Sequence, residues 1–311
     1  MVEGKAEPLE GWLAGDLGSG MDYGGDDPTA GLMSTEGGED DSGWGSAQGV
    51  PDVIDPTGKY TLVKKGAFTA VNVTWNENIP GSEGFKSEAG AMVSMSRNTD
   101  IDARMDPDCQ TACCRCCCAG ESCCTSYYSN VGGGINDVLI APSLPGEIVL
   151  INIDSDRPWR VQKGSYLASD NDVTVAAVFN QDCCGAALSG EGLFVLKASC
   201  EEGKAGRLLV NSYGSILRYD LGPGESRFFD NGVLVAWEDH LQYVIGFADR
   251  SGAQGVGGMM GRMATSFLSG EGIGMTFTGP GTIYVQTRSI QAFILSLIPH
   301  LPPSKVPQAQ D

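Results

Sequence analysis

The chain has 311 residues, of which 41% are hydrophobic, and a formal net charge of −19 from 20 basic and 39 acidic side chains. This composition is sufficient for a buried core, and the acidic excess argues against a protein that neutralises nucleic-acid phosphates. The sequence has no run of about eighteen apolar residues, so we expect no membrane-spanning helix.

Residues 1–57 form an acidic, glycine-rich segment that we expect to be a disordered tail. The first 50 residues hold eleven carboxylates and one lysine, Lys5. Such a segment is too polar to offset the entropy of ordering it. We interpret it as a solubilising extension, and the alternative is that its isolated aromatic residues dock on a partner. Because the N-terminus has the features of neither a secretory signal nor a mitochondrial presequence, we expect a cytoplasmic protein.

Residues 58–290 have the texture of an all-β domain. Short runs rich in Val, Ile, Tyr and Phe alternate with Gly and Pro, which is typical of strands and turns. The expected strands include residues 60–63, 67–73, 138–140, 148–153, 173–179, 193–197, 207–210, 233–237, 243–247 and 282–286. One short helix is expected at 258–268, where methionines recur at helical spacing. Residues 291–311 are expected to form a C-terminal extension with a Pro-rich end.

A short motif occurs three times in this domain. The three copies are Gly120-Glu121, Gly190-Glu191 and Gly270-Glu271. Each copy follows a Gly-led apolar run, at 90–95, 164–168 and 232–237, and precedes a Gly turn at Gly146, Gly214 or Gly281. The order of these features predicts three similar β repeats over about 85–153, 161–220 and 228–288. We expect the repeats to bury their apolar faces together in a β-sandwich or pseudo-threefold prism, with the Glu side chains accepting backbone N–H bonds at turns.

Three segments resemble a known family. The sequences VQKGSYLAS (161–169), LSGEGLF (188–194) and FTGPGTIYVQTR (277–288) are similar to signature stretches of the altered-inheritance-of-mitochondria protein 24 family. The resemblance covers roughly residues 85–288. It implies a β-sandwich of three repeats with an attenuator-like shape, a tendency to form homo-oligomers and no established enzymatic activity. Fungal relatives act in mitochondria, which makes a mitochondrial location the alternative. We do not expect RNA binding, because no basic and aromatic stripe is present.

A dense group of cysteines is the most distinctive feature of the sequence. Eight of the eleven cysteines lie between Cys109 and Cys124. Two C-x-x-C pairs suit a zinc site, with candidate ligands Cys113, Cys114, Cys116, Cys117, Cys183 and Cys184. S-acylation is a second hypothesis, with candidate sites Cys116, Cys117, Cys118, Cys123 and Cys124. Redox sensing is the third.

Core packing is the interpretation that we favour for these cysteines. Aligning the three Gly-Glu motifs places Cys118 opposite Leu188 and Leu268, and places Cys124 opposite Phe194. A free cysteine at such a position behaves as a small buried hydrophobic residue. We therefore expect no cofactor, with zinc as the alternative.

No catalytic constellation is evident. His240 is interpreted as a solvated turn residue, His300 lies in the C-terminal extension, and the Gly-rich run 252–261 lacks the Lys-Ser/Thr ending of a phosphate loop. We expect a non-enzymatic structural or interaction protein. Its partners would be a second copy of itself, another protein or a membrane surface contacted through the cysteine-rich loop. The alternative is a thiol-dependent zinc-binding or redox-responsive protein.

Overall fold

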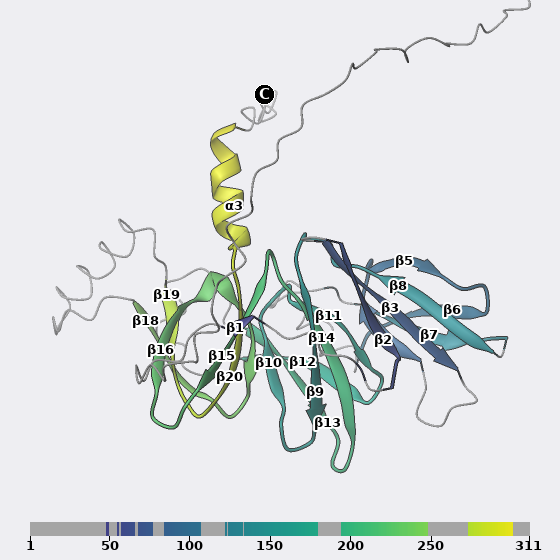
Figure 1. Ribbon diagram of the computed structural model, residues 1–311, viewed down its shortest axis with the longest axis horizontal. Helices are drawn as coiled ribbons and strands as arrows, with labels where there is room; N and C mark the ends of the chain where they lie inside the picture. The colour runs from purple at the N-terminus through teal and green to yellow at the C-terminus, as the bar shows by residue number, and fades with distance from the viewer. Residues whose placement is uncertain are drawn as a thin grey trace, which may run out of the picture. The chain divides into compact units, whose positions relative to one another are not determined.

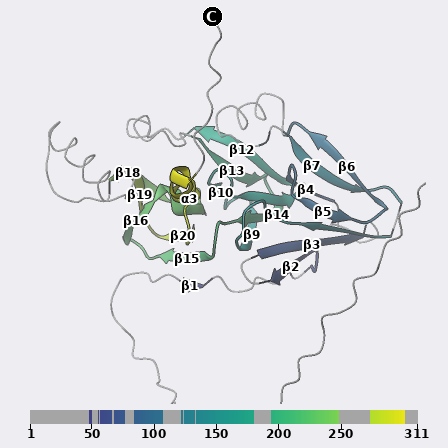
Figure 2. The ribbon, with the colours of Figure 1, turned by 90° about the horizontal axis from the view of Figure 1, so that it is seen from above.

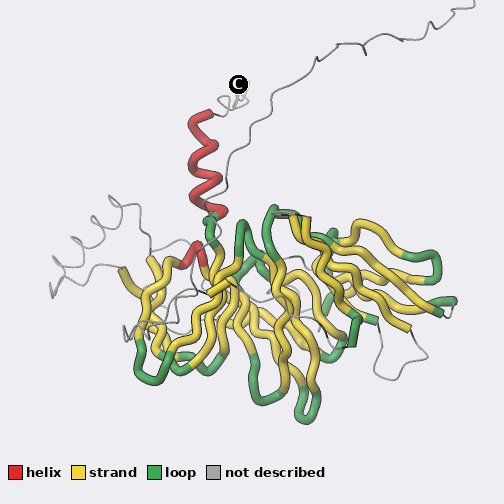
Figure 3. Tube along the Cα trace, viewed as in Figure 1, coloured by secondary structure: helices red, strands yellow, loops and turns green. Residues whose placement is uncertain are grey.

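A computed structural model describes residues 48–49, 55, 57–65, 68–76, 84–106, 122, 124–132, 134–179, 194–247 and 273–300 (Figure 1). These residues belong to one compact unit, Trp44–Asp311. The helix expected at 258–268 lies outside them. The described part of the chain is all-β, as the sequence predicted (Figure 3). Its strands pair antiparallel.

Eighteen of the strands form three consecutive sets of six. Set 1 consists of β3 (Phe68–Asn76), β4 (Phe85–Glu88), β5 (Met92–Met95), β6 (Thr99–Arg104), β7 (Thr125–Asn130) and β8 (Ile135–Ile140). Set 2 consists of β9 (Ile148–Asp154), β10 (Trp159–Val161), β11 (Tyr166–Asp170), β12 (Val173–Phe179), β13 (Phe194–Cys200) and β14 (Ala205–Asn211). Set 3 consists of β15 (Ile216–Leu221), β16 (Ser226–Asp230), β17 (Leu234–Glu238), β18 (Gln242–Phe247), β19 (Ile273–Thr278) and β20 (Gly281–Gln286).

The same strand pairing occurs in all three sets. The first and third strands pair with the sixth, as in β3·β8 and β5·β8, β9·β14 and β11·β14, and β15·β20 and β17·β20. The second and fourth strands pair with the fifth, as in β4·β7 and β6·β7, β10·β13 and β12·β13, and β16·β19 and β18·β19. Each third strand also carries a β-bulge at the same place, at Val93, Leu167 and Val235.

Neighbouring sets are joined by one further pairing. The second strand of one set pairs with the third strand of the next, as β4·β11 and β10·β17. This creates a first composite sheet, β6-β7-β4-β11-β14-β9, and a second, β1-β15-β20-β17-β10-β13-β12, where β1 is Gln48–Gly49. Two half-sheets remain. The front half-sheet is β2-β3-β8-β5, with β2 at Tyr60–Lys65, and the rear half-sheet is β16-β19-β18.

Three hydrophobic cores lie between these four sheets. The first, around Val71, Phe85 and Leu167, fills the space between the front half-sheet and the first composite sheet. A second core lies between the two composite sheets, and a third lies between the second composite sheet and the rear half-sheet. The alternating burial along β3 fits a strand with one covered face, whereas every residue of β11 is buried because both faces of its sheet are covered.

Some expected boundaries differ from the structure. The described structure begins inside the segment 1–57 that we expected to be a tail, because β1 pairs with β15 and Asp55 is buried. The Gly281 turn is not equivalent to the other two. Gly146 and Gly214 precede first strands, but Gly281 begins a sixth strand, β20.

Three helical segments complete the described chain. A short 3-10 helix, η2 (Asn231–Val233), precedes β17. After β20 come the α-helix α3 (Ile290–Leu297) and the 3-10 helix η3 (Ile298–His300), which the sequence analysis did not predict. Ser289 caps α3 by accepting a hydrogen bond from the Ala292 N–H.

Candidate functional site

Most of the predicted site residues lie outside the described part of the chain. This applies to Cys113, Cys114, Cys116, Cys117, Cys118, Cys123, Cys183, Cys184, Gly120, Glu121, Gly190, Glu191, Gly270 and Glu271. Cys124 is described, is half-buried, and donates its N–H to the Ser122 Oγ at 3.2 Å. The zinc, acylation and redox hypotheses therefore stay predictions. The residues that the structure describes contain no cluster of metal-ligating side chains.

The described strands nevertheless define which connections carry these residues. The cysteine-rich segment connects β6 to β7, the segment with Cys183 and Cys184 connects β12 to β13, and Gly270-Glu271 lies between β18 and β19. All three segments link the fourth strand of a set to the fifth. The alignment of the Gly-Glu motifs and the pairing of the strands thus assign the three motifs to equivalent connections.

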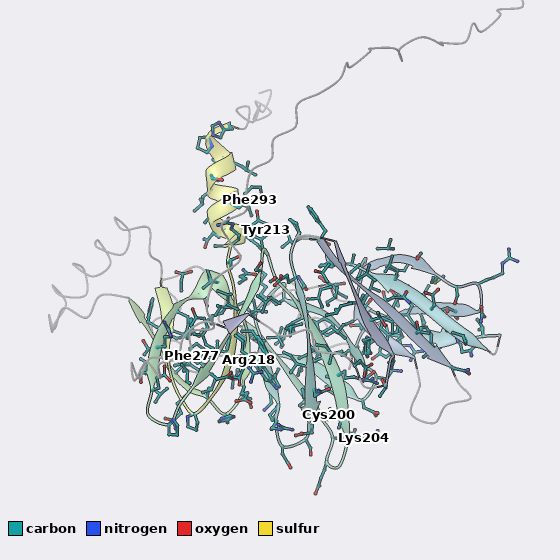
Figure 4. All side chains as sticks on the ribbon, in the orientation of Figure 1. Cys200, Lys204, Tyr213, Arg218, Phe277 and Phe293 are labelled. Carbon is teal, nitrogen blue, oxygen red and sulfur yellow. The ribbon has the colours of Figure 1, made fainter. Side chains whose placement is uncertain are left out.

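Cys200 on β13 is a packing residue. Its half-buried thiol contacts the Ile153 carbonyl oxygen at 3.9 Å and packs against the core between the composite sheets (Figure 4). Burial, reinforced by Asp172, raises the pKa of the thiol above its ordinary value of 9.0. A neutral thiol of this kind is a poor nucleophile and a poor metal ligand.

The edge of β5 is the first feature that points to function. The corresponding strands β11 and β17 are paired on both sides and are almost entirely buried. Within the described residues β5 pairs only with β8, and all four of its residues, Met-Val-Ser-Met, are exposed. At the bulge Val93 is 59% exposed, whereas its counterparts Leu167 and Val235 are 0% exposed. An apolar strand therefore lies uncovered in the position where its two counterparts are covered.

The edge of β16 is the second such feature. The corresponding strands β4 and β10 each have partners on both sides, but in the described structure β16 pairs only with β19. Phe228 occupies the position of Lys86 in β4 and Arg160 in β10, as the strand registers show. The guanidinium of Arg227 lies over the Tyr219 ring at 4.6 Å, and its buried Nη1 has no hydrogen-bond partner among the described residues.

The exposed helix α3 is a third candidate surface. Residues 291–300 are all exposed, and they include Phe293, Ile294, Leu295, Leu297 and Ile298. The Phe293 ring contacts the ring of Tyr213, in the turn between β14 and β15, with centroids 5.7 Å apart. Figures 1 and 4 show α3 leaving the end of β20 and projecting from the strands, with Phe293 beside Tyr213 at its base.

A buried ionic network holds the segment before β2 against set 2. Arg207 on β14 donates to both carboxylate oxygens of Asp55, at 2.9 and 2.8 Å, and to Asp170 on β11 at 2.7 Å. Lys59 donates to Asp170 at 2.6 Å, and the Tyr60 hydroxyl also bonds to that carboxylate, at 2.8 Å. The Asp55 side chain is 0% exposed and that of Arg207 is 13% exposed.

Both carboxylates in this network are stabilised in their ionised form. Burial by itself would raise the pKa of Asp55, but hydrogen bonds from Tyr60, Thr57 and Arg207 outweigh it and hold the pKa below 3.8. Burial opposes ionisation of Asp170 as well, and the nearby Lys59 and Arg207 lower its pKa. Sequence reasoning missed the network because Asp55 and Arg207 are 152 positions apart and no local pattern relates them.

His240 lies in a solvent-exposed turn. Its side chain is 62% exposed in the turn between β17 and β18, and its Nε2 lies 3.0 Å from the Pro280 carbonyl oxygen. Its position agrees with the interpretation as a solvated turn residue. The nearby Asp239 instead accepts hydrogen bonds from Arg160 at 2.6 Å and Lys197 at 2.7 Å, which stabilises the β10·β17 junction.

Comparison with known proteins places the chain in a family. Residues 60–288, which include strands β2 to β20, match the family described as mitochondrial biogenesis AIM24. The chain belongs to the AIM24 family. An uncharacterized protein of Streptococcus pyogenes serotype M6 is 34% identical to it over 173 residues, which is 55% of this chain and 62% of that protein. The match therefore spans less than two thirds of the relative's length.

The AIM24 fold of this chain is also similar to a solved structure. The crystal structure of a Streptococcus pyogenes protein matches it with a TM-score of 0.58 and 25% sequence identity. The match covers 78% of this chain and 99% of the solved protein. In the described part of this AIM24 family member, no helix has the length and apolar character needed to cross a bilayer.

Proposed function

We propose that this protein is a non-enzymatic scaffold that assembles with further copies of itself through exposed strand edges. The observation that carries the proposal is the exposed β5 edge, whose counterparts in sets 2 and 3 are buried and paired. An exposed apolar strand edge presents unpaired N–H and C=O groups to another chain. Covering a side chain such as Val93 would add roughly 1.5–3 kcal/mol of hydrophobic stabilisation.

We further propose that the three strand sets are copies of one module. The recurring pairing, the shared bulge and the equivalent fourth-to-fifth connections support this, as does the Gly-Glu motif in the sequence. When modules of this kind are joined one after another, one half-sheet stays open at each end of the series. Repeat proteins commonly need either caps or further copies to cover such ends.

A scaffold role also fits the chemistry of the buried charged groups. Asp55 and Asp170 bind Arg207 and Lys59, and Asp239 binds Arg160 and Lys197. These carboxylates are already engaged in ion pairs that join neighbouring segments. They therefore support structural roles and are poorly placed to transfer protons to a substrate.

The test is the mass of the full-length protein in solution. We expect sedimentation or light scattering to give a species larger than the 32.6 kDa monomer. Val93→Lys on β5 should shift the population to monomer, since a lysine on an edge strand opposes pairing. Val244→Lys is the matched control, because Val244 is an exposed valine on β18. This fourth strand lies at the end of its sheet, as the fourth strands β6 and β12 do in theirs, so its position gives no reason to expect a further partner. A monomeric wild type, or equal effects of the two variants, would contradict the proposal.

The helix α3 favours a second role, peripheral contact with a lipid bilayer. Apolar side chains are exposed on more than one face of this helix, and no charged residue lies between Arg288 and His300. A protein groove covers one stripe of a helix, whereas the bilayer interface can surround most of it. At about 1.5 Å per residue the eight-residue helix is too short to span a membrane, so it would lie at the interface.

Vesicle flotation tests this second role. We expect the full-length protein to float with neutral phosphatidylcholine vesicles, which do not repel a chain of net charge −19. Ile294→Asp should abolish flotation, and Ile135→Asp, at another exposed isoleucine, on β8, should not. Loss of flotation in both variants, or none in the wild type, would count against membrane contact through α3.

A further inference from the structure

We propose that β16 of one copy pairs antiparallel with β5 of the next copy and so completes a third composite sheet. This inference rests on the self-assembly proposed above and specifies its two partner edges. The front half-sheet holds the first, sixth and third strands of set 1, and the rear half-sheet holds the second, fifth and fourth strands of set 3. Each composite sheet is the union of these same two kinds of half. The two half-sheets are therefore the unjoined halves of a sheet that the chain builds twice already.

The partner edge belongs to another copy because the two edges of one chain are separated. The three cores and the two composite sheets lie between the front and rear half-sheets. Figures 1 and 2 show β16 and β5 on opposite sides of the described strands, with β15, β20, β10 and β14 of the composite sheets between them. A contact between two different edges is heterologous, so it links copies head to tail and closes a ring or extends a filament.

The two existing junctions predict the register of the new one. In β4·β11, Lys86 lies opposite Ser169, and in β10·β17, Arg160 lies opposite Trp237. The bulges and the pairing with the sixth strands make Met95 the counterpart of Ser169 and Trp237. Phe228 is the counterpart of Lys86 and Arg160. Each of these three residues lies six positions before the last paired residue ahead of the bulge, which is Met92, Tyr166 or Leu234. Phe228 should thus lie opposite Met95, with Phe229 opposite Ser94 and Arg227 opposite Ser96.

The side chains at this register are complementary. Phe228 and Met95 would bring two apolar side chains together, and the exposed Val93 would be covered as Leu167 and Val235 are. Arg227 has a buried Nη1 without a partner in the described structure, and it would face Ser96 beside the exposed Asp137. A carboxylate near that guanidinium would supply the missing acceptor.

The free backbone groups of both edges also match. Ser96 donates its N–H to Asp137 on β8, so the N–H of Met95 points away from β8. Gly279 donates its N–H to the carbonyl oxygen of Glu225, so the backbone groups of Glu225 point toward β19. Because backbone groups alternate in direction along a strand, Phe228, three residues later, points its N–H away from β19. Proline at either position would remove one hydrogen bond of the new junction and none of the existing ones.

Mixing two proline variants tests the inference. Met95→Pro keeps an intact β16 edge, and Phe228→Pro keeps an intact β5 edge. We expect each full-length variant alone to be monomeric and a 1:1 mixture to form a species of twice the monomer mass by light scattering. That result requires one β5 edge and one β16 edge at each junction.

Other outcomes separate this inference from the proposed function. A monomeric wild type overturns self-assembly itself. If the wild type assembles but the mixture stays monomeric, or if Phe228→Pro alone still forms dimers through β5 and β5, the head-to-tail junction is wrong. Circular dichroism and the unfolding midpoint verify folding. Should a proline variant fail to fold, Val93→Lys replaces Met95→Pro and Phe228→Asp replaces Phe228→Pro.

Discussion

At the residue scale, the Asp55, Lys59, Asp170 and Arg207 network has the greatest structural consequence. It joins the segment before β2 to β11 and β14 of set 2 through ion pairs that are shielded from solvent. Removing one member of a buried ionic network leaves the others charged without compensation. Solvent-exposed ion pairs contribute far less, because water and salt screen them.

Arg207→Met should lower the free energy of unfolding by about 3–5 kcal/mol, since the buried Asp55 loses its ion-pair partner and Asp170 keeps only Lys59. Urea denaturation followed by circular dichroism measures the loss. Arg157→Met is the control, because Arg157 forms an exposed ion pair with Asp154 and should cost less than about 1 kcal/mol. Similar costs for both variants would show that the network does not stabilise the fold.

The same network makes stability depend on acidity. The pKa values of Asp55 and Asp170 are lower in the folded chain than their ordinary value of 3.8, so the unfolded chain binds protons first as the pH falls. Their contribution is complete above pH 3.8 and is lost as the pH drops below it through the folded pKa values. When melting temperatures are measured from pH 7 to pH 2, they should fall steeply below pH 3.8. A parallel fall in Arg207→Met would contradict the assignment.

The cysteines give a further prediction at this scale. If Cys113, Cys114, Cys116 and Cys117 act as packing residues, the purified protein should contain no stoichiometric zinc, and a chelator should leave its unfolding midpoint unchanged. Metal analysis and intact mass measure both points. One zinc per chain, lost together with stability on chelation, would favour the zinc hypothesis instead. Added acyl mass would favour membrane recruitment through these residues.

At the element scale, the turns that lead into the first strands are tightly packed. Gly146, ahead of β9, lies so close to the connection between β14 and β15 that a Cβ there would be 1.9 Å from the Ser212 carbonyl oxygen. The carbonyl oxygen of the adjacent Glu147 accepts a hydrogen bond from the Ser212 N–H, and the Glu147 N–H donates to the Gly214 carbonyl oxygen and lies 3.2 Å from the Ser212 Oγ. Any side chain at position 146 would clash with backbone atoms, which have little room to move away. The contact therefore requires glycine.

Gly146→Ala should therefore destabilise the protein by about 1–3 kcal/mol, the usual range for overpacking. Chemical denaturation of the variant gives the value. Gly246→Ala on β18 is the matched control, because a Cβ at Gly246 meets no atom within 4 Å. If Gly146→Ala unfolds at the same denaturant concentration as the control, the close approach is not a constraint on the fold.

At the scale of the whole molecule, the N-terminal strands connect distant sets. The chain runs from β1, which pairs with β15 of set 3, past the Asp55 network on set 2, to β2, which pairs with β3 of set 1. One short stretch thus contacts all three sets. Its position explains why the stable fold extends further toward the N-terminus than composition alone indicates.

Shortened chains measure this connection. A chain starting at Trp44 keeps β1 and Asp55, so we expect its unfolding midpoint to match that of the full-length protein. A chain starting at Lys59 lacks both and should unfold at a clearly lower temperature. Equal stability of the two shortened chains would show that β1 and Asp55 add nothing to the fold.

The sequence by itself determined the all-β class, the family and the approximate position of many strands. Runs such as 173–179 and 282–286 coincide with all or most of β12 and β20, because enrichment in β-branched and aromatic residues is a local property of the sequence. The helix α3 was not predicted, because its eight residues are too few to show a helical period clearly in the sequence. Most candidate cysteines lie outside the described residues, so their roles rest on sequence alone.

Only the tertiary structure decided which strands are neighbours and which edges remain open. Met92–Met95 and Leu234–Glu238 are both apolar runs that follow a glycine, yet the first is exposed and the second is buried. The difference arises because β17 has β10 beside it, whereas no described strand covers the outer edge of β5. Strand partners, like the pairing of Asp55 with Arg207, depend on contacts between residues far apart in the chain, and local sequence patterns carry no record of them.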